Sequence, residues 1–64
     1  MTVNGENQKQ SGRISLSEFL IREGFQTERI AVERNGEIVP KSSYQSTFLE
    51  DDDRLEIVNF VGGG

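Results

Sequence analysis

The last three residues, Gly62, Gly63 and Gly64, carry the group that is best placed for chemistry, a free α-carboxylate at the end of the chain. They follow a hydrophobic segment directly, without a serine-rich or charged spacer. Residues without side chains can pass through a narrow channel and adopt backbone angles that other residues avoid. The stretch from Val61 to Gly64 reaches about 13 Å when extended. We therefore predict that residues 62–64 form a flexible tail that threads into another protein, although a frayed chain end has the same composition.

The chain contains no cysteine and no histidine, so its own side chains offer little catalytic chemistry. Without cysteine there is no thiolate nucleophile, and without histidine there is no side chain that ordinarily titrates near neutral pH. A chain of 64 residues also has little depth in which to bury a catalytic group. We expect a carrier, substrate or binding module with no catalytic residues, and not an enzyme.

The charge and hydropathy of the chain argue against several classes of partner. The net charge is -4 and the basic residues are scattered, whereas binding to nucleic acid needs clustered lysine and arginine. No apolar run approaches the roughly 20 residues that span a bilayer, and no signal peptide is visible. These features predict a cytoplasmic protein that binds neither nucleic acid nor membranes and is a monomer when free.

The N-terminal segment predicts a hairpin. Residues 1–4 partly alternate in polarity, and Asn4-Gly5 is a turn signal of the kind that joins antiparallel strands. Residues 6–12 are polar throughout, which is typical of a loop. We predict that the second strand of this hairpin is short and lies at residues 13–14.

A short helix follows this hairpin. Ser15 and Glu18 have the spacing of a capping box, in which each residue bonds the backbone of the other. Gly24 fits the left-handed position that commonly ends a helix. The helix is therefore predicted over residues 16–23, and the spacing of its apolar residues gives it one buried stripe, formed by Leu16, Phe19 and Leu20.

Three further strands are predicted in the second half of the chain. The Asn-Gly pair at residues 35–36 separates two runs with apolar residues, at 30–34 and 37–39, and predicts a tight hairpin between them. The last strand is predicted over residues 55–61. Because one helix can cover only one face of a sheet, we predict an α+β fold with one main helix on one face of a mixed four- to five-stranded sheet. This is the β-grasp pattern, with residues 1–61 as its single domain and the central and final strands side by side.

The last strand has two faces with different predicted roles. Alternation places Leu55 and Ile57 on one face, which we assign to the core beneath the helix. Val58 and Phe60 are then exposed on the other face, close to the tail. Together with Val61 they form a predicted docking surface for a partner. A shift of the register by one residue would exchange the two faces.

Other conspicuous residues are assigned structural roles. Phe48 is predicted to lie in the core. The acidic run at residues 51–53 lacks the ligand spacing of a calcium loop, so we predict a solvated turn and no metal site. The charged residues around the second hairpin, Glu33, Arg34 and Glu37, are predicted to form a solvated face.

The sequence resembles the family of thiamine-biosynthesis sulfur carriers (ThiS), bacterial relatives of ubiquitin, over nearly the whole chain. The most specific feature is the ending -Val-Gly-Gly-Gly after an apolar strand at this chain length. The turn at residues 51–53 departs from the Asp-Gly-Asp that the family often has. The matching residues are Val3-Asn4-Gly5, Ser15-Leu16, Ala31-Val32-Glu33-Arg34-Asn35, Ile38-Val39-Pro40, Tyr44, Thr47-Phe48-Leu49, Leu55-Glu56-Ile57-Val58 and Phe60-Val61-Gly62-Gly63-Gly64.

This resemblance implies a ubiquitin-like fold and a specific use of the tail. It implies that an E1-like adenylating enzyme, with its own ATP and Mg²⁺, converts the Gly64 carboxylate into an acyl-adenylate. A persulfide from a cysteine desulfurase or another donor would then yield a thiocarboxylate, and this group would donate sulfur to thiazole synthase. The carrier itself would bind no cofactor, while Gly62 and Gly63 would thread into the partners.

Three alternative functions fit the same general pattern. The small subunit of molybdopterin synthase is also a β-grasp sulfur carrier that ends in Gly-Gly, although such chains are usually longer. A ubiquitin-like modifier would instead form isopeptide bonds between Gly64 and lysines of target proteins. A plain binding module would keep its function after Gly63 and Gly64 are removed.

Overall fold

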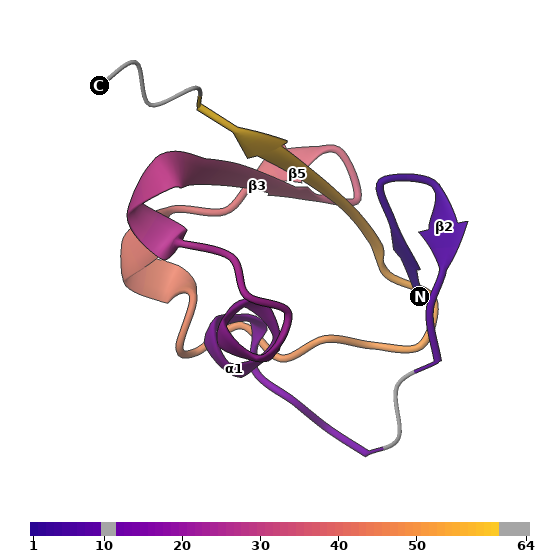
Figure 1. Cartoon of the computed structure of the whole chain (residues 1–64). Coiled ribbons are helices and arrows are strands. Elements are labelled where there is room, and N and C mark those ends of the chain that lie inside the picture. The colour runs from indigo at the N-terminus through magenta and orange to yellow at the C-terminus, as the bar shows by residue number, and fades with distance from the viewer. Residues whose placement is uncertain (10–11, 61–64) are drawn as a thin grey trace.

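The computed structural model describes residues 1–9 and 12–60, which form one mixed sheet and one α-helix. The five strands lie in the order β2-β1-β5-β3-β4, with β1 and β5 parallel and the other neighbours antiparallel. Figure 1 shows α1 on one side of this sheet, viewed along its axis. This is the predicted α+β arrangement, with β3 and β5 side by side. The elements are β1 (Thr2–Val3), β2 (Glu6–Asn7), α1 (Leu16–Arg22), β3 (Ile30–Arg34), β4 (Glu37–Ile38), β5 (Arg54–Asn59) and the 3₁₀ turns η1 (Thr27–Arg29) and η2 (Lys41–Ser43).

Helix α1 begins and ends where its capping residues predict. The Ser15 hydroxyl accepts a hydrogen bond from the Glu18 backbone N–H at 3.1 Å, which satisfies one of the free donors of the first turn. At the other end Gly24 has φ +85°, and the Phe25 N–H donates to the Leu20 carbonyl at 2.9 Å, closing a Schellman motif. The predicted last residue, Glu23, is the C-cap, so the helix itself ends one residue earlier, at Arg22.

The core lies between α1 and the inner face of the sheet. The predicted apolar stripe of the helix is fully buried, and the buried side chains of β3 and β5 belong to the same core. Leu55 and Ile57 are both buried, so the register predicted for the last strand is confirmed. The core residues are Val3, Leu16, Phe19, Leu20, Ile30, Val32, Tyr44, Leu49, Leu55 and Ile57.

The first hairpin is tighter than the sequence analysis predicted. Asn4 and Gly5 both have positive φ, as a two-residue type I′ turn requires, so the chain reverses at once. The second strand is therefore β2, directly after the turn, and the prediction of a strand at residues 13–14 was wrong. The Asn4 side chain also bonds β5, because its Oδ1 accepts from the Ile57 N–H at 2.7 Å and its Nδ2 donates to the Ile57 carbonyl at 3.3 Å.

Asp53 corrects the prediction of a solvated acidic turn, since its side chain is only 3% exposed. Its Oδ2 accepts from the Arg34 Nε–H and from the Glu50 N–H, both at 2.8 Å, and its Oδ1 accepts from Asn35 Nδ2 at 3.0 Å. Burial raises the pKa of Asp53, but these hydrogen bonds and the Arg34 charge outweigh it and hold the pKa below its usual value. Arg34 likewise does not belong to a purely solvated face, because it ties the second hairpin to the turn before β5.

Phe48 was predicted to be a core residue, and this was also wrong. Its side chain is partly exposed, and the guanidinium carbon of Arg13 lies 4.4 Å from the centre of its ring. The next residue, Leu49, is buried and takes the core position. Because successive residues of an extended segment point to opposite sides, only one of the two can face the core.

Asp53→Asn is expected to lower the free energy of unfolding by about 2 kcal/mol at pH 7, because an amide cannot replace a carboxylate that accepts three hydrogen bonds. The folded-state pKa of Asp53 is lowered, so its stabilisation is present above the ordinary carboxyl pKa and disappears as the pH falls through the folded value. The difference in the free energy of unfolding between wild type and variant should therefore become smaller below about pH 4. Urea unfolding at several pH values measures this difference. A similar loss of stability in the exposed control Asp52→Asn would contradict the stabilising role of Asp53.

Candidate functional site

The predicted docking residues of the last strand lie on the outer face of the sheet, away from α1. Val58 and Phe60 are 58% and 52% exposed, whereas Ile57, the residue before Val58, is buried. Both residues are therefore placed as predicted. Val61, Gly62, Gly63 and Gly64 lie outside the described residues.

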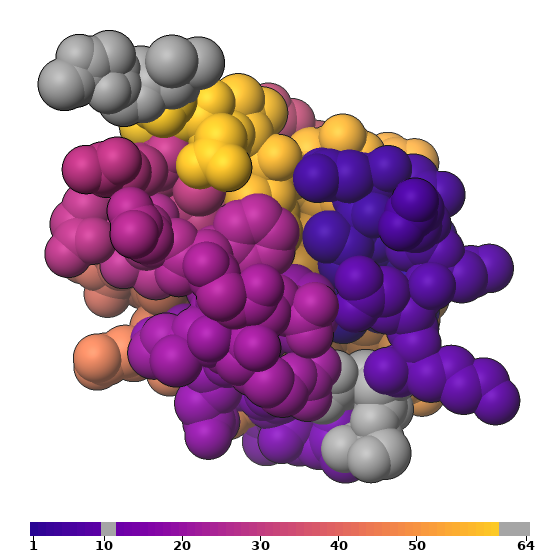
Figure 2. All heavy atoms as spheres, in the orientation of Figure 1, coloured from indigo at the N-terminus to yellow at the C-terminus, as the bar shows by residue number. Residues whose placement is uncertain are grey.

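Phe60 is held at the end of β5 by contacts with two 3₁₀ turns. Its N–H donates to the Arg29 carbonyl at 2.7 Å, which continues the β3–β5 pairing by one residue. The Lys41 ammonium lies 6.0 Å from the centre of its ring and also donates to the Glu28 carbonyl at 3.2 Å. In Figure 2 the yellow atoms at the end of β5 reach the surface beside the magenta segment that contains η1. Phe60, which lies close to the predicted tail in the sequence, thus has a defined position in the fold.

Ile38 is a member of this surface that the sequence analysis missed. It is 73% exposed, the largest fraction among the exposed large hydrophobic residues of the described chain. The tight turn at residues 35–36 fixes the register of β4 and places Ile38 opposite Glu33, whose side chain is exposed. Residues directly opposite each other in a ladder share a face, so this register could have revealed Ile38 from the turn alone.

Together these residues form an apolar surface, which we call the outer patch and define as Ala31, Ile38, Val58 and Phe60. Val58 lies directly opposite Ala31 in the β3–β5 ladder. A shallow hollow of about 210 Å³ borders the patch, and its lining is almost entirely apolar. Such a surface is suited to docking a protein, because its apolar atoms leave water when a partner covers them.

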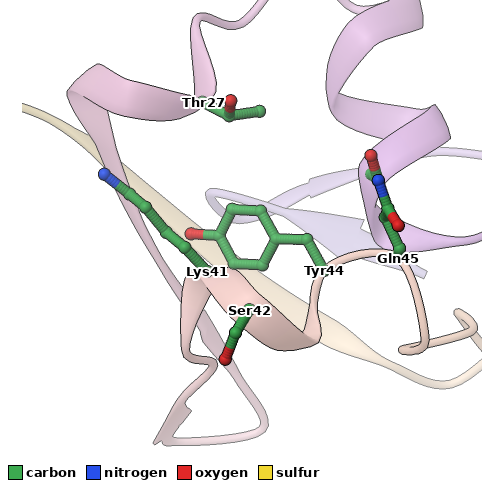
Figure 3. A pocket seen from close by; sticks show the side chains of 6 residues that line it. Thr27, Lys41, Ser42, Tyr44 and Gln45 are labelled. Atoms are coloured by element: carbon green, nitrogen blue, oxygen red, sulfur yellow. The ribbon is translucent and has the colours of Figure 1, made fainter.

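A second hollow of about 360 Å³ is polar, and it offers hydroxyl, amide and ammonium groups. Figure 3 shows the Tyr44 ring lying in it with the hydroxyl directed toward the Lys41 side chain. Burial raises the pKa of Tyr44, so this phenol stays protonated at neutral pH. Among residues 1–9 and 12–60 no group of three potential ligands could hold a metal ion. The hollow is lined by Ser17, Thr27, Lys41, Ser42, Tyr44 and Gln45.

The profile of the ThiS family matches residues 1–64, the whole chain. The chain is 37% identical over 67 aligned residues to the sulfur carrier protein ThiS of Bacillus subtilis, covering all of this chain and 98% of that protein. It is also 45% identical over 64 residues to a thiazole synthase of Paramagnetospirillum magneticum and 39% identical over 62 residues to one of Magnetococcus marinus. The chain spans only about a fifth of the length of these two thiazole synthases, covering 20% and 19% of them.

A solved structure gives the same picture of the fold. The crystal structure of the thiamine biosynthesis protein ThiS from Geobacter metallireducens superposes with a TM-score of 0.81 at 33% identity. The match covers 98% of this chain and 96% of that one. The predicted ubiquitin-like β-grasp fold is thereby confirmed. In the described part of the chain, no helix is both long and apolar enough to cross a membrane.

The same substitution on two paired strands distinguishes the outer patch from the core. Val58→Thr should leave the free energy of unfolding within about 0.5 kcal/mol of wild type, because the side chain is already hydrated. Val32→Thr should lower it by about 2 kcal/mol, because a hydroxyl would enter a fully buried site. Urea unfolding measures both values. Equal losses in the two variants would show that Val58 is packed and is not part of a free surface.

Proposed function

Because the chain belongs to the ThiS family, we propose that it is a sulfur carrier of thiamine biosynthesis and that Gly64 holds the sulfur as a thiocarboxylate. The observation that carries this function is the match to a sulfur carrier along almost the entire length of both proteins. The exposed outer patch at the end of β5 supports it, because a carrier must be held by enzymes that act on its tail. The chain would be a co-substrate of those enzymes and not itself a catalyst.

Activation of the carboxylate is the first chemical requirement, because a carboxylate is a poor electrophile. An E1-like partner would bind ATP and Mg²⁺ and transfer the adenylyl group to the Gly64 carboxylate, with pyrophosphate as the leaving group. The mixed anhydride that results has a good leaving group, AMP. The chain contributes a carboxylate on a residue without Cβ, which can enter a narrow active site.

Sulfur transfer would follow by attack of a donor persulfide, from a cysteine desulfurase or from the partner's own cysteine. The terminal sulfur displaces AMP and forms an acyl disulfide. A second thiol then cleaves the S–S bond, which leaves the thiocarboxylate on Gly64 and a disulfide on the donor side. The donors must come from partners, because this chain contains no cysteine.

Delivery of the sulfur would take place on thiazole synthase. Two thiazole synthases contain a region similar to this chain, which supports a carrier and a synthase that act together. In both encounters Val58, Phe60 and Val61 would dock on the partner while Gly62 and Gly63 thread into it. Docking contacts would offset the entropy lost when three glycines become ordered.

Intact mass spectrometry tests this function. After incubation with ATP, Mg²⁺, the adenylating enzyme and a persulfide source, the wild-type chain should gain about 16 Da, the exchange of one oxygen for sulfur at the acyl carbon. A chain without Gly64 is the matched control and should gain nothing. The same gain should appear in protein isolated from its native host.

Other results would favour the alternative functions. An unchanged mass in both chains, under conditions that load a known carrier, would contradict the sulfur-carrier role. Higher-mass conjugates with a Gly64 remnant on target lysines would indicate a protein modifier. If a strain that lacks the gene is rescued by a molybdopterin precursor and not by thiazole, the carrier serves the molybdopterin pathway.

A further inference from the structure

Two glutamates lie directly opposite each other on the outer face of the sheet. Glu33 of β3 pairs with Glu56 of β5 in the antiparallel ladder. Both side chains are exposed, and their neighbours Val32 and Ile57 are buried, so both carboxylates point away from α1. Side chains at directly opposed positions have Cβ atoms only about 5 Å apart.

This arrangement opposes folding, because like charges directly opposite each other destabilise a sheet. Within residues 1–9 and 12–60 the ion pairs are Arg22–Glu23 and Arg34–Asp53, and neither includes Glu33 or Glu56. Arg34 follows Glu33 in the chain, but its guanidinium is directed to the opposite side, where it meets Asp53. Neither carboxylate thus has an ion-pair partner among the described residues of the free protein.

The glutamate pair is continuous with the outer patch. Ile38 lies beside Glu33 in the β3–β4 ladder, and Val58 follows Glu56 by two residues on the same face. A partner that covers Ile38 and Val58 must therefore also come close to both carboxylates. An apolar surface with one acidic end fits a partner surface with an apolar centre and a basic side chain at one end.

We propose that Glu33 and Glu56 together receive a cationic side chain of the adenylating enzyme, with an arginine as the best fit. This inference rests on the sulfur-carrier function proposed above. A guanidinium has donors on two edges and can bond two carboxylates at once, while its charge removes their repulsion. Partial exclusion of water at the interface strengthens this attraction relative to an exposed pair.

The pair would also orient the carrier on the enzyme. Glu56 precedes Phe60 by four residues, a separation of about 13 Å along a strand. A charged contact at one end of the docking surface and Phe60 at the other therefore define a direction along β5. Docking in the reverse orientation would place a basic side chain against Phe60 and leave both carboxylates unpaired. Only one orientation directs residues 61–64 toward the active site.

The double variant Glu33→Gln/Glu56→Gln tests this inference through two readouts that should move in opposite directions. Removing the repulsion should raise the melting temperature by about 3 °C. Removing the charges should raise the KM for the carrier in the adenylation reaction about tenfold and leave kcat unchanged, since the tail is intact. KM should also lose much of its dependence on salt. ATP–pyrophosphate exchange with the adenylating enzyme measures both kinetic constants.

Asp51→Asn/Asp52→Asn is the matched control, because it removes the same two charges from exposed positions in the turn before β5. It should keep the wild-type KM. An unchanged KM in the glutamate variant, or an equal rise in both variants, would overturn the inference while wild-type loading still supports the carrier function. A glutamate variant that is less stable than wild type would show that the pair stabilises the fold, which would also contradict the inference. A wild-type chain that is never adenylated would overturn the proposed function and this inference together.

Discussion

In the described part of the chain, one seven-residue helix faces a five-stranded sheet, and this constraint decides what each face of the sheet does. The helix can bury only one face, so alternate residues of β3 and β5 enter the core while their neighbours stay exposed. The exposed set contains Ile38, Val58 and Phe60, which the fold itself cannot cover. An exposed apolar surface is therefore a direct consequence of this small architecture.

Polar side chains fix the frame that presents this surface. Asn4 bonds both backbone groups of Ile57, and Asp53 joins Arg34 and Asn35 to the turn before β5. Both sets act on the strand that leads to the predicted tail. A domain of 64 residues buries a limited fraction of its surface and is only marginally stable, so the loss of one such link would matter. These hydrogen bonds fix β5, so Phe60 at its end has a defined position although its side chain is exposed.

Local patterns in the sequence predicted the parts of the fold that depend on local physics. The capping box, Gly24 and the Asn-Gly turns act over a few residues, and α1 and the second hairpin appear where these signals place them. The Asp53–Arg34 pair spans 19 positions and has no local signature, so both residues looked like ordinary surface charges. Alternation along the last strand predicted the exposed residues of β5, whereas a prediction of Ile38 needed the register of β4. A prediction that Glu33 lies opposite Glu56 needed the register between β3 and β5.

In the proposed function the outer face of the sheet, and not the helix, receives the adenylating enzyme. Ile38 and Ile21 provide a direct comparison, because they are 73% and 67% exposed on the sheet and on the helix, respectively. The most direct measurement is an NMR titration of isoleucine δ1-methyl groups with this enzyme. If the enzyme docks on the outer face, the Ile38 signal should shift or broaden while those of Ile21 and the buried Ile57 do not. A response at Ile21 with Ile38 unchanged would show that the enzyme docks on the helix instead.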